Sequence, residues 1–144
     1  MGARPMFALM QSTRTQSLHL FNDPQTGLKA VVAIHNERLG PAMGGCRYLP
    51  YADDESAMTD AIALAQGMSY KAALAGLPLG GGKAVVMRNP HVENRAALFQ
   101  VLGRFIDTLH GRFVVAGDSG TSTLDMDCIA QGTPHATSTT AGDD

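Results

Sequence analysis

Residues 54–87, DESAMTDAIALAQGMSYKAALAGLPLGGGKAVVM, place a long helical pattern, a break and a buried strand pattern in direct succession. The helix is predicted over 54–75, with Asp53 as N-cap and acidic residues in the first turn, where the helix dipole favours negative charge. Glycine and proline at 76 and 78 end it, and 84–87 is predicted to be a short buried strand. The helix is expected to bury an apolar face formed by Met58, Ile62, Ala65 and Met68.

The flanking sequence adds strands and helices in alternation. Upstream, an alternating segment (16–22), turn residues (23–27) and a β-branched run (28–35) predict a β-hairpin, and 44–49 is a third extended segment. Downstream, the predicted elements are a helix over 91–110, a strand over 113–116 and a short helix over 122–130. The first of these helices should turn inward Leu98, Val101, Leu102, Phe105 and Leu109. This order predicts an α/β domain with a mixed, partly parallel sheet flanked by helices.

Composition limits the class of protein. The chain has 144 residues, of which 44% are hydrophobic and 17% charged, so it suits one folded domain and not a disordered chain. The net charge of −2 argues against a basic nucleic-acid surface. Cys46 and Cys128 are too few for a disulfide framework and lack metal-ligand spacing, so no metal is expected. Because neither a bilayer-spanning run nor a secretory signal is recognised, we expect a cytoplasmic domain without a membrane partner.

The last residues differ in composition from the rest. Residues 132–144, GTPHATSTTAGDD, have almost nothing to bury. The sequence therefore predicts a folded domain over 1–131 and a linker or loop over 132–144.

Two motifs resemble known sites but do not match them. Residues 117–120 read GDSG, yet the nucleophile-elbow pattern fails at Thr121, and the chain is too short for a two-barrel serine protease. Residues 80–83 read GGGK, but Leu77 and Ala84 stand where a phosphate-binding loop needs glycine and a hydroxyl residue. The sequence contains no dinucleotide-binding glycine pattern either, so no cofactor is expected on this chain alone.

Three features together suggest chemistry: the glycine-rich segment 40–47, the pair Lys71 and Lys83, and Asp118 after a strand. Glycines permit close approach of a ligand to the backbone, and a partly buried lysine near a second cation would have a lowered pKa suited to a general base. Simpler interpretations stay open. Lys71 is also placed as a helix-dipole partner, the glycines as a tight turn, and Asp118 as the N-cap of the next helix.

The segments GPAMGGCRYLPY (40–51), MSYKAALAGLPLGGGKAVV (68–86) and LGRFIDTLHGRFVVAGDSGTSTLDMD (102–127) resemble the N-terminal domain of the Glu/Leu/Phe/Val amino-acid dehydrogenases, closest to the leucine, valine and phenylalanine branch. The resemblance implies reversible oxidative deamination of an L-amino acid to its 2-oxo acid and ammonia with NAD or NADP. It also implies a homo-oligomer. It ends near Thr140, before any C-terminal Rossmann domain that would hold the cofactor.

The resemblance also implies roles for individual residues. Lys71 and the backbone at Gly44 and Gly45 would hold the substrate α-carboxylate. Lys83 would be the catalytic base that activates water, and Asp118 would exchange protons with the amino group. Met43, Met68 and Ala116 would line the side-chain pocket.

Met43 narrows the substrate class. Glutamate-specific relatives have a lysine at this place, and an unpaired substrate carboxylate in a closed pocket would be costly. Met43 therefore favours a branched-chain or aromatic amino acid, although it also suits plain core filling. The sequence departs from the family pattern at Gly117 and Ser119, which flank Asp118. A non-catalytic oligomerisation or amino-acid-sensing module derived from the family is the alternative function.

Overall fold

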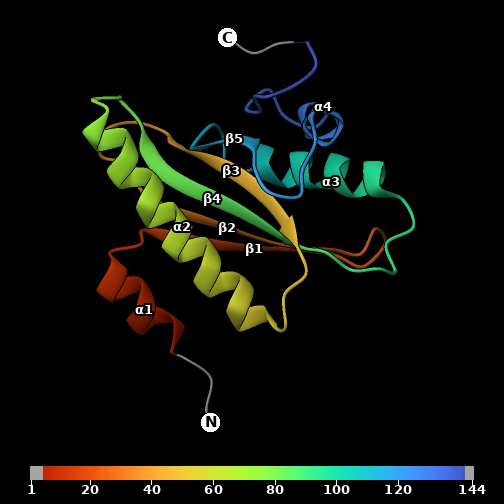
Figure 1. Ribbon diagram of the computed structural model, residues 1–144, viewed down its shortest axis with the longest axis horizontal. Helices are drawn as coiled ribbons and strands as arrows, with labels where there is room; N and C mark the ends of the chain where they lie inside the picture. The colour runs from red at the N-terminus through yellow and green to blue at the C-terminus, as the bar shows by residue number, and fades with distance from the viewer. Residues whose placement is uncertain (1–4, 142–144) are drawn as a thin grey trace.

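The computed structural model describes residues 5–141, which form a five-stranded sheet between two pairs of helices (Figure 1). In chain order the elements are α1 (Met6–Thr13), β1 (Ser17–Asp23), β2 (Leu28–Asn36), β3 (Ala42–Leu49), α2 (Asp54–Leu74), β4 (Gly80–Met87), α3 (Arg95–Asp107), β5 (Phe113–Gly117) and α4 (Thr123–Ala130). Helices α1 and α2 lie on one face of the sheet and α3 and α4 on the other (Figure 1). The predicted fold class is confirmed.

The sheet has the order β1-β2-β4-β3-β5. The predicted hairpin pairs β1 with β2, and β2 also runs antiparallel to β4, whereas β3 is parallel to both β4 and β5. The connection through α2 crosses from β3 to β4, and the connection through α3 crosses back from β4 to β5. Right-handed crossovers in opposite directions place their helices on opposite faces, which explains the three layers.

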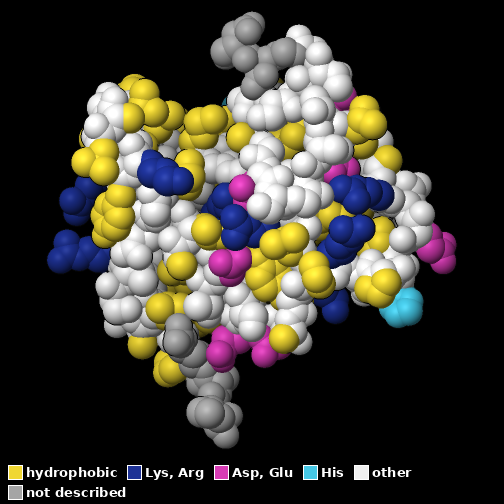
Figure 2. Space-filling view, in the orientation of Figure 1, with side chains coloured by type: hydrophobic (Ala, Val, Ile, Leu, Met, Phe, Trp, Pro, Cys, Tyr) yellow, Lys and Arg dark blue, Asp and Glu magenta, His cyan; other side chains and the backbone are white. Residues whose placement is uncertain are grey.

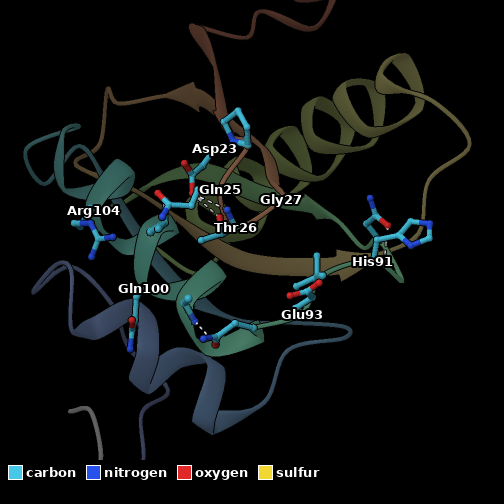
Figure 3. Close-up of a pocket in the computed structure, with 14 residues that line it drawn as sticks. Asp23, Gln25, Thr26, Gly27, His91, Glu93, Gln100 and Arg104 are labelled. Carbon is cyan, nitrogen blue, oxygen red and sulfur yellow. Dashed lines mark hydrogen bonds between the residues drawn. The ribbon is translucent and has the colours of Figure 1, made fainter.

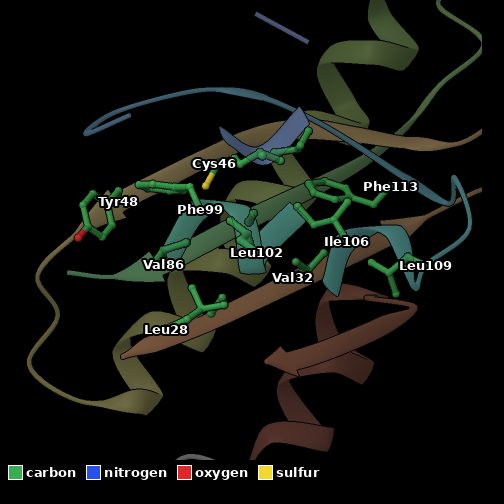
Figure 4. Packing of buried hydrophobic residues seen from close by; sticks show 14 of the residues in the cluster. Leu28, Val32, Cys46, Tyr48, Val86, Phe99, Leu102, Ile106, Leu109 and Phe113 are labelled. Atoms are coloured by element: carbon green, nitrogen blue, oxygen red, sulfur yellow. The ribbon is translucent and has the colours of Figure 1, made fainter. Parts of the chain in front are cut away.

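Two hydrophobic clusters hold the layers together. The larger one packs α3 and α4 against the sheet and includes Phe99, Leu102, Ile106 and Phe113, all fully buried (Figure 4). The smaller one packs α2 against β2 and β4 through alanines, Ile62 and Val85. Short alanine side chains let α2 lie close to the sheet.

The buried face of α2 differs from the prediction. Its buried residues are Ala57, Ala61, Ile62, Ala65, Ser69 and Ala72. Met58 and Met68 are only half-buried, because the small residues, and not the methionines, face the sheet. Asp53 caps the helix as predicted, through a bond from the Ser56 amide to its side chain at 2.7 Å.

The glycine triplet is strand and not the tight turn weighed from sequence. Gly80, Gly81 and Gly82 belong to β4, so Lys83 lies in the middle of a strand instead of opening one. A Cβ on Gly81 would lie 2.2 Å from the Ser69 amide nitrogen of α2, and one on Gly82 would lie 2.7 Å from the Phe113 ring. Packing on both faces therefore requires glycine here.

Other elements also differ from the predicted ones in their bounds. Helix α3 begins at Arg95, not at 91, because Asn94 caps it by accepting from the Ala97 amide at 3.0 Å. Helix α1 was not predicted. Residues 132–141 contain no helix or strand, but Thr133 is buried and Ala136 bridges to Val115, so the expectation that this segment buries almost nothing is wrong. Residues 142–144 of the predicted linker lie outside the described part of the chain.

Candidate functional site

The α2 face of the sheet carries the predicted strand residues. Side chains alternate along a strand, and Ala42, Cys46 and Tyr48 of β3 belong to the core on the α3 face. The residues between them face α2, namely Met43, Gly45 and Arg47. The same alternation turns Lys83 of β4 toward α2, together with Ala116 and Asp118 at the end of β5.

Helix α2 supplies the opposite wall. Asp60, Leu64, Met68 and Lys71 recur at spacings of four, four and three and form a stripe beside the buried alanine face. Lys71 is two residues beyond Ser69, where Gly81 lets the helix approach β4 closely. The close contact between α2 and β4 thus positions Lys71 near the cavity that contains Lys83.

Strands and helix enclose a cavity of about 360 Å³. Its lining includes every predicted site residue, namely Met43, Gly44, Gly45, Met68, Lys71, Lys83, Ala116 and Asp118. Figure 2 shows basic and acidic side chains close together near the middle of the view, among hydrophobic ones. The structure therefore brings the predicted residues together around one cavity.

Lys83 and Asp118 form an ion pair, with Nζ and Oδ2 3.0 Å apart. Lys83 is only 5% exposed, and the Asp118 side chain is 23% exposed. Partial burial raises the pKa of Asp118, but hydrogen bonds from Lys83 and Arg47 outweigh it and hold that pKa below its usual value. Asp118 does not cap α4, as the simpler interpretation had it, because Ser122 is the N-cap.

Lys71 has a different environment from Lys83. Lys71 is exposed at the rim of the cavity, so Lys83 and not Lys71 is the buried lysine of the pair. Among residues 5–141, Lys71 forms no ion pair with a carboxylate, whereas Lys83 does. A cation without a protein counter-ion at a cavity mouth is suited to an anionic ligand.

The glycines leave room for these charged groups. A Cβ on Gly45 would lie 2.6 Å from the Asp118 Cβ and 3.2 Å from the Lys83 Nζ. One on Gly44 would lie 1.7 Å from the Gly82 carbonyl oxygen of the neighbouring strand. Neither position accommodates a side chain, which explains the glycine pair in β3.

Sequence reasoning missed the contact that Arg47 makes in the site, because the motifs assign no role to this residue. Arg47 donates from Nε to Asp118 Oδ2 at 2.9 Å. Thr121 supports the same loop, because its hydroxyl accepts from the Asp118 amide at 2.9 Å and lies 3.0 Å from the Cys46 carbonyl oxygen. The two residues of the Arg47–Asp118 pair are 71 positions apart in the sequence, so no local pattern could have predicted their contact.

The other candidates stay outside the site. Burial raises the pKa of the Cys46 thiol to about 12, so Cys46 has core character and no nucleophile character. Within residues 5–141, no cluster of histidine, cysteine and carboxylate side chains has the arrangement of a metal site. None of the helices described there is long and apolar enough to cross a membrane.

A larger cavity, of about 870 Å³, lies between the β1–β2 turn and the first turns of α3 (Figure 3). Asp23, Glu93 and Arg104 line it, but none of the predicted site residues does. The Asp23 carboxylate already accepts a bond from the Thr26 hydroxyl at 2.6 Å. The lining mixes opposite charges and indicates no class of ligand.

Comparison with known families agrees with the sequence pattern. The family described as "Glu/Leu/Phe/Val dehydrogenase, dimerisation domain" matches residues 14–135. This chain belongs to that family. The resemblance predicted from the three motifs is thereby confirmed.

Individual members of the Glu/Leu/Phe/Val dehydrogenase family are similar to most of this chain. Leucine dehydrogenase of Geobacillus stearothermophilus is 45% identical over 132 residues, 92% of this chain and 36% of the relative. Valine dehydrogenase of Streptomyces albus is 50% identical over 112 residues, 78% of this chain and 31% of the relative. The crystal structure of L-tryptophan dehydrogenase from Nostoc punctiforme is 39% identical, with a TM-score of 0.87 over 92% of this chain and 39% of that one. The chain thus spans about a third of the length of its curated relatives.

Proposed function

We propose that this chain is the substrate-binding and oligomerisation domain of a cytoplasmic L-amino-acid dehydrogenase, which deaminates an apolar amino acid to its 2-oxo acid and ammonia with NAD or NADP. The observation that carries the proposal is the buried Lys83–Asp118 ion pair at the base of a cavity with Lys71 at its rim. We assign this role to the predicted domain over 1–131, onto which Thr133 and Ala136 of the predicted linker over 132–144 also pack.

The charges of the site favour a monocarboxylate. Arg47, Lys71 and Lys83 face two carboxylates, Asp60 and Asp118, which leaves one net positive charge. Lys71 would hold the substrate α-carboxylate, helped by the backbone of Gly44 and Gly45. A second substrate carboxylate, as in glutamate, would find no further cation beside Met43.

An adjoining apolar recess supports an apolar side chain. A cavity of about 250 Å³ shares three lining residues with the site, namely Met43, Met68 and Lys71. Its remaining lining consists of Ala72, Ala75, Leu77, Leu79 and Gly80. Together with Ala116 in the main cavity, these surfaces suit a branched-chain or aromatic substrate.

The proposed chemistry uses Lys83 and Asp118 in turn. Asp118 would accept a proton from the substrate ammonium group. Once the substrate is an imine, Lys83 would take a proton from water as the water oxygen bonds to the imine carbon. Asp118 would then return its proton to the nitrogen. The C–N bond would break to release ammonia as the Asp118 carboxylate takes up the hydroxyl proton and the 2-oxo acid forms. A sensing module would need Lys71 but neither of these groups, so the pair supports an enzyme.

The dinucleotide would be held elsewhere than on the described residues. The glycine run 80–82 is buried strand, and Lys83 is turned to Asp118, so this segment does not form a phosphate-binding turn. The cofactor would supply the hydride acceptor when a partner domain holds it against the substrate carbon.

Binding to the isolated chain tests the site without turnover. Titration of the ¹⁵N-labelled chain with 4-methyl-2-oxopentanoate should shift the amide signals of Gly44, Gly45 and Ala116. Lys71→Gln should weaken binding at least about tenfold, because a charge-assisted bond contributes about 1.5–3 kcal/mol. Arg112→Gln, which removes a surface ion pair with Glu37, is the matched control and should bind normally. Equal affinity for 2-oxoglutarate, or binding unaffected by Lys71→Gln, would contradict the proposal.

A further inference from the structure

Arg47 holds the same carboxylate oxygen as Lys83. Arg47 Nε lies 2.9 Å from Asp118 Oδ2, and Lys83 Nζ lies 3.0 Å from that atom. The two cations come from neighbouring strands, β3 and β4, while Asp118 follows β5. One partly buried oxygen therefore accepts from two charged donors.

Arg47 is itself held from α2. Its Nη1 lies 3.7 Å from Asp60 Oδ2, and Asp60 accepts a bond from the Tyr51 hydroxyl. Burial and this bond both raise the pKa of Tyr51, so its hydroxyl remains a donor at neutral pH. The Arg47 side chain is 23% exposed, so solvent only partly screens its contacts. Asp60, which Tyr51 holds, thus adds a second and longer ion pair to the guanidinium from the α2 side.

The proposed reaction creates a need for a second cation. Lys83 acts as a base only as a neutral amine, and the neutral amine no longer balances the charge of Asp118. If Lys83 were the only counter-ion, its deprotonation would leave a partly buried carboxylate unpaired, which is costly. Lys71 lines the same cavity, but the substrate carboxylate would occupy it. A guanidinium keeps its charge at any physiological pH.

We propose that Arg47 is the permanent counter-ion and positioning residue of Asp118, so that Lys83 can lose its proton while Asp118 stays charged and in place. The inference rests on the proposed function, because it takes Lys83 as the base. Arg47 touches neither substrate nor reacting atoms in this account. It acts through Asp118.

An NMR titration of the Asp118 carboxyl carbon in the whole chain tests the proposal, with Asp118→Asn used to assign the signal. In Lys83→Met, Arg47 alone should keep the titration midpoint below the ordinary aspartate value of about 3.9. In the double variant Lys83→Met with Arg47→Met, the midpoint should rise by at least about one pH unit and exceed that value, because only the bond from the Ser119 amide then opposes burial. Arg47→Lys in the Lys83→Met background should give an intermediate midpoint.

The outcomes separate this inference from the proposed function. If the midpoint already exceeds 3.9 in Lys83→Met, or does not move further when Arg47 is replaced, Arg47 is not the counter-ion. Arg112→Met is the matched control, since Arg112 pairs with Glu37 outside the site, and should leave the midpoint unchanged. If Arg47→Met loses the dispersed amide spectrum of a folded chain, the midpoint of Arg47→Lys in the Lys83→Met background is the test. A midpoint equal to that of Lys83→Met alone would then contradict the role of Arg47. The carboxyl titration needs no ligand. If the midpoints shift as expected but the chain binds no 2-oxo acid, the proposed function is overturned while the role of Arg47 as counter-ion stands.

Discussion

Gly45 lies so close to Asp118 that a Cβ on Gly45 would stand 2.6 Å from the Asp118 Cβ. The same atom would lie 2.9 Å from the Gly117 carbonyl oxygen, so backbone as well as side chain would have to move. The catalytic pair of the proposed site is thus accommodated by the absence of a side chain on the adjacent strand.

Gly45→Ala should therefore displace Asp118 and weaken ligand binding. We expect a loss of about 1–3 kcal/mol in stability, typical of overpacking, and at least tenfold weaker binding of 4-methyl-2-oxopentanoate. Thermal unfolding and NMR titration measure the two effects. Gly67→Ala is the control for stability, since nothing lies within 4 Å of its Cβ, and alanine should stabilise the helix interior by about 0.8–1 kcal/mol. Wild-type stability and affinity in Gly45→Ala would refute the steric argument.

Met43→Lys should change the substrate class. The new ammonium group would pair with a side-chain carboxylate, so the affinity for 2-oxoglutarate should rise at least about tenfold and that for 4-methyl-2-oxopentanoate should fall. Met43→Gln has nearly the same length without the charge and should not gain 2-oxoglutarate binding. If both variants behave alike, Met43 is core filling and does not determine specificity.

His35 links both helices of the α2 face to the sheet. Its Nδ1 lies 2.8 Å from the Ser69 hydroxyl, and its Nε2 lies 2.8 Å from the Thr13 carbonyl oxygen. His35→Leu should cost about 1–3 kcal/mol, because it removes the histidine partner of the buried Ser69 hydroxyl and leaves the Thr13 carbonyl oxygen with only the longer bond from Gln66. Denaturant unfolding measures the loss. His19→Leu, at a half-buried position on β1, is the comparison and should cost less; a similar loss would show that only packing matters.

Asp125 should make stability depend on acid pH. Burial raises the pKa of Asp125, but bonds from Arg95 and Ser122 hold it below its usual value. A carboxyl group whose pKa is lower in the folded than in the unfolded state stabilises the fold above about pH 3.9, and this contribution is lost as the pH falls through the folded value. Asp125→Asn should cost about 1.5–3 kcal/mol near pH 7 and little near pH 2.

Chemical denaturation at both pH values measures that difference. Glu37→Gln breaks the ion pair with Arg112, whose side chain is 43% exposed, and should cost less than about 1 kcal/mol at pH 7. A loss for Asp125→Asn that is the same at pH 2 and pH 7 would contradict the assignment to its charge.

Local sequence signals were sufficient for most of the fold. The hairpin turn over 23–27 and the Asp53 cap each fix an element through a contact within a few residues. Helix α1 had no such signal, since it is eight residues long, begins after Pro5 without a side-chain cap and buries no residue completely. Glycines 80–82 have no strand propensity, and their place in β4 depends on pairing with β2 and β3 and on close packing against Asn36, α2 and Phe113.

The site, too, was predictable where motifs carry it and not where it depends on contacts between distant residues. Lys71, Lys83 and Asp118, which the family motifs singled out, line one cavity, but composition could not show that Lys71 is exposed and Lys83 buried. The role of Arg47 depends on a partner 71 residues away and on Asp60 across the cavity. Such long-range pairing arises from the sheet order β4-β3-β5, which no local pattern specifies.

The most direct test of the central claim is NADH oxidation by the natural product of the gene that encodes this chain. The assay contains ammonia and either 4-methyl-2-oxopentanoate, phenylpyruvate or 2-oxoglutarate. We predict turnover with an apolar 2-oxo acid, little with 2-oxoglutarate, and a loss of about 10²–10⁴-fold in Lys83→Ala. Absence of turnover with either apolar acid, or full activity in Lys83→Ala, would contradict the assignment of this site to amino-acid deamination.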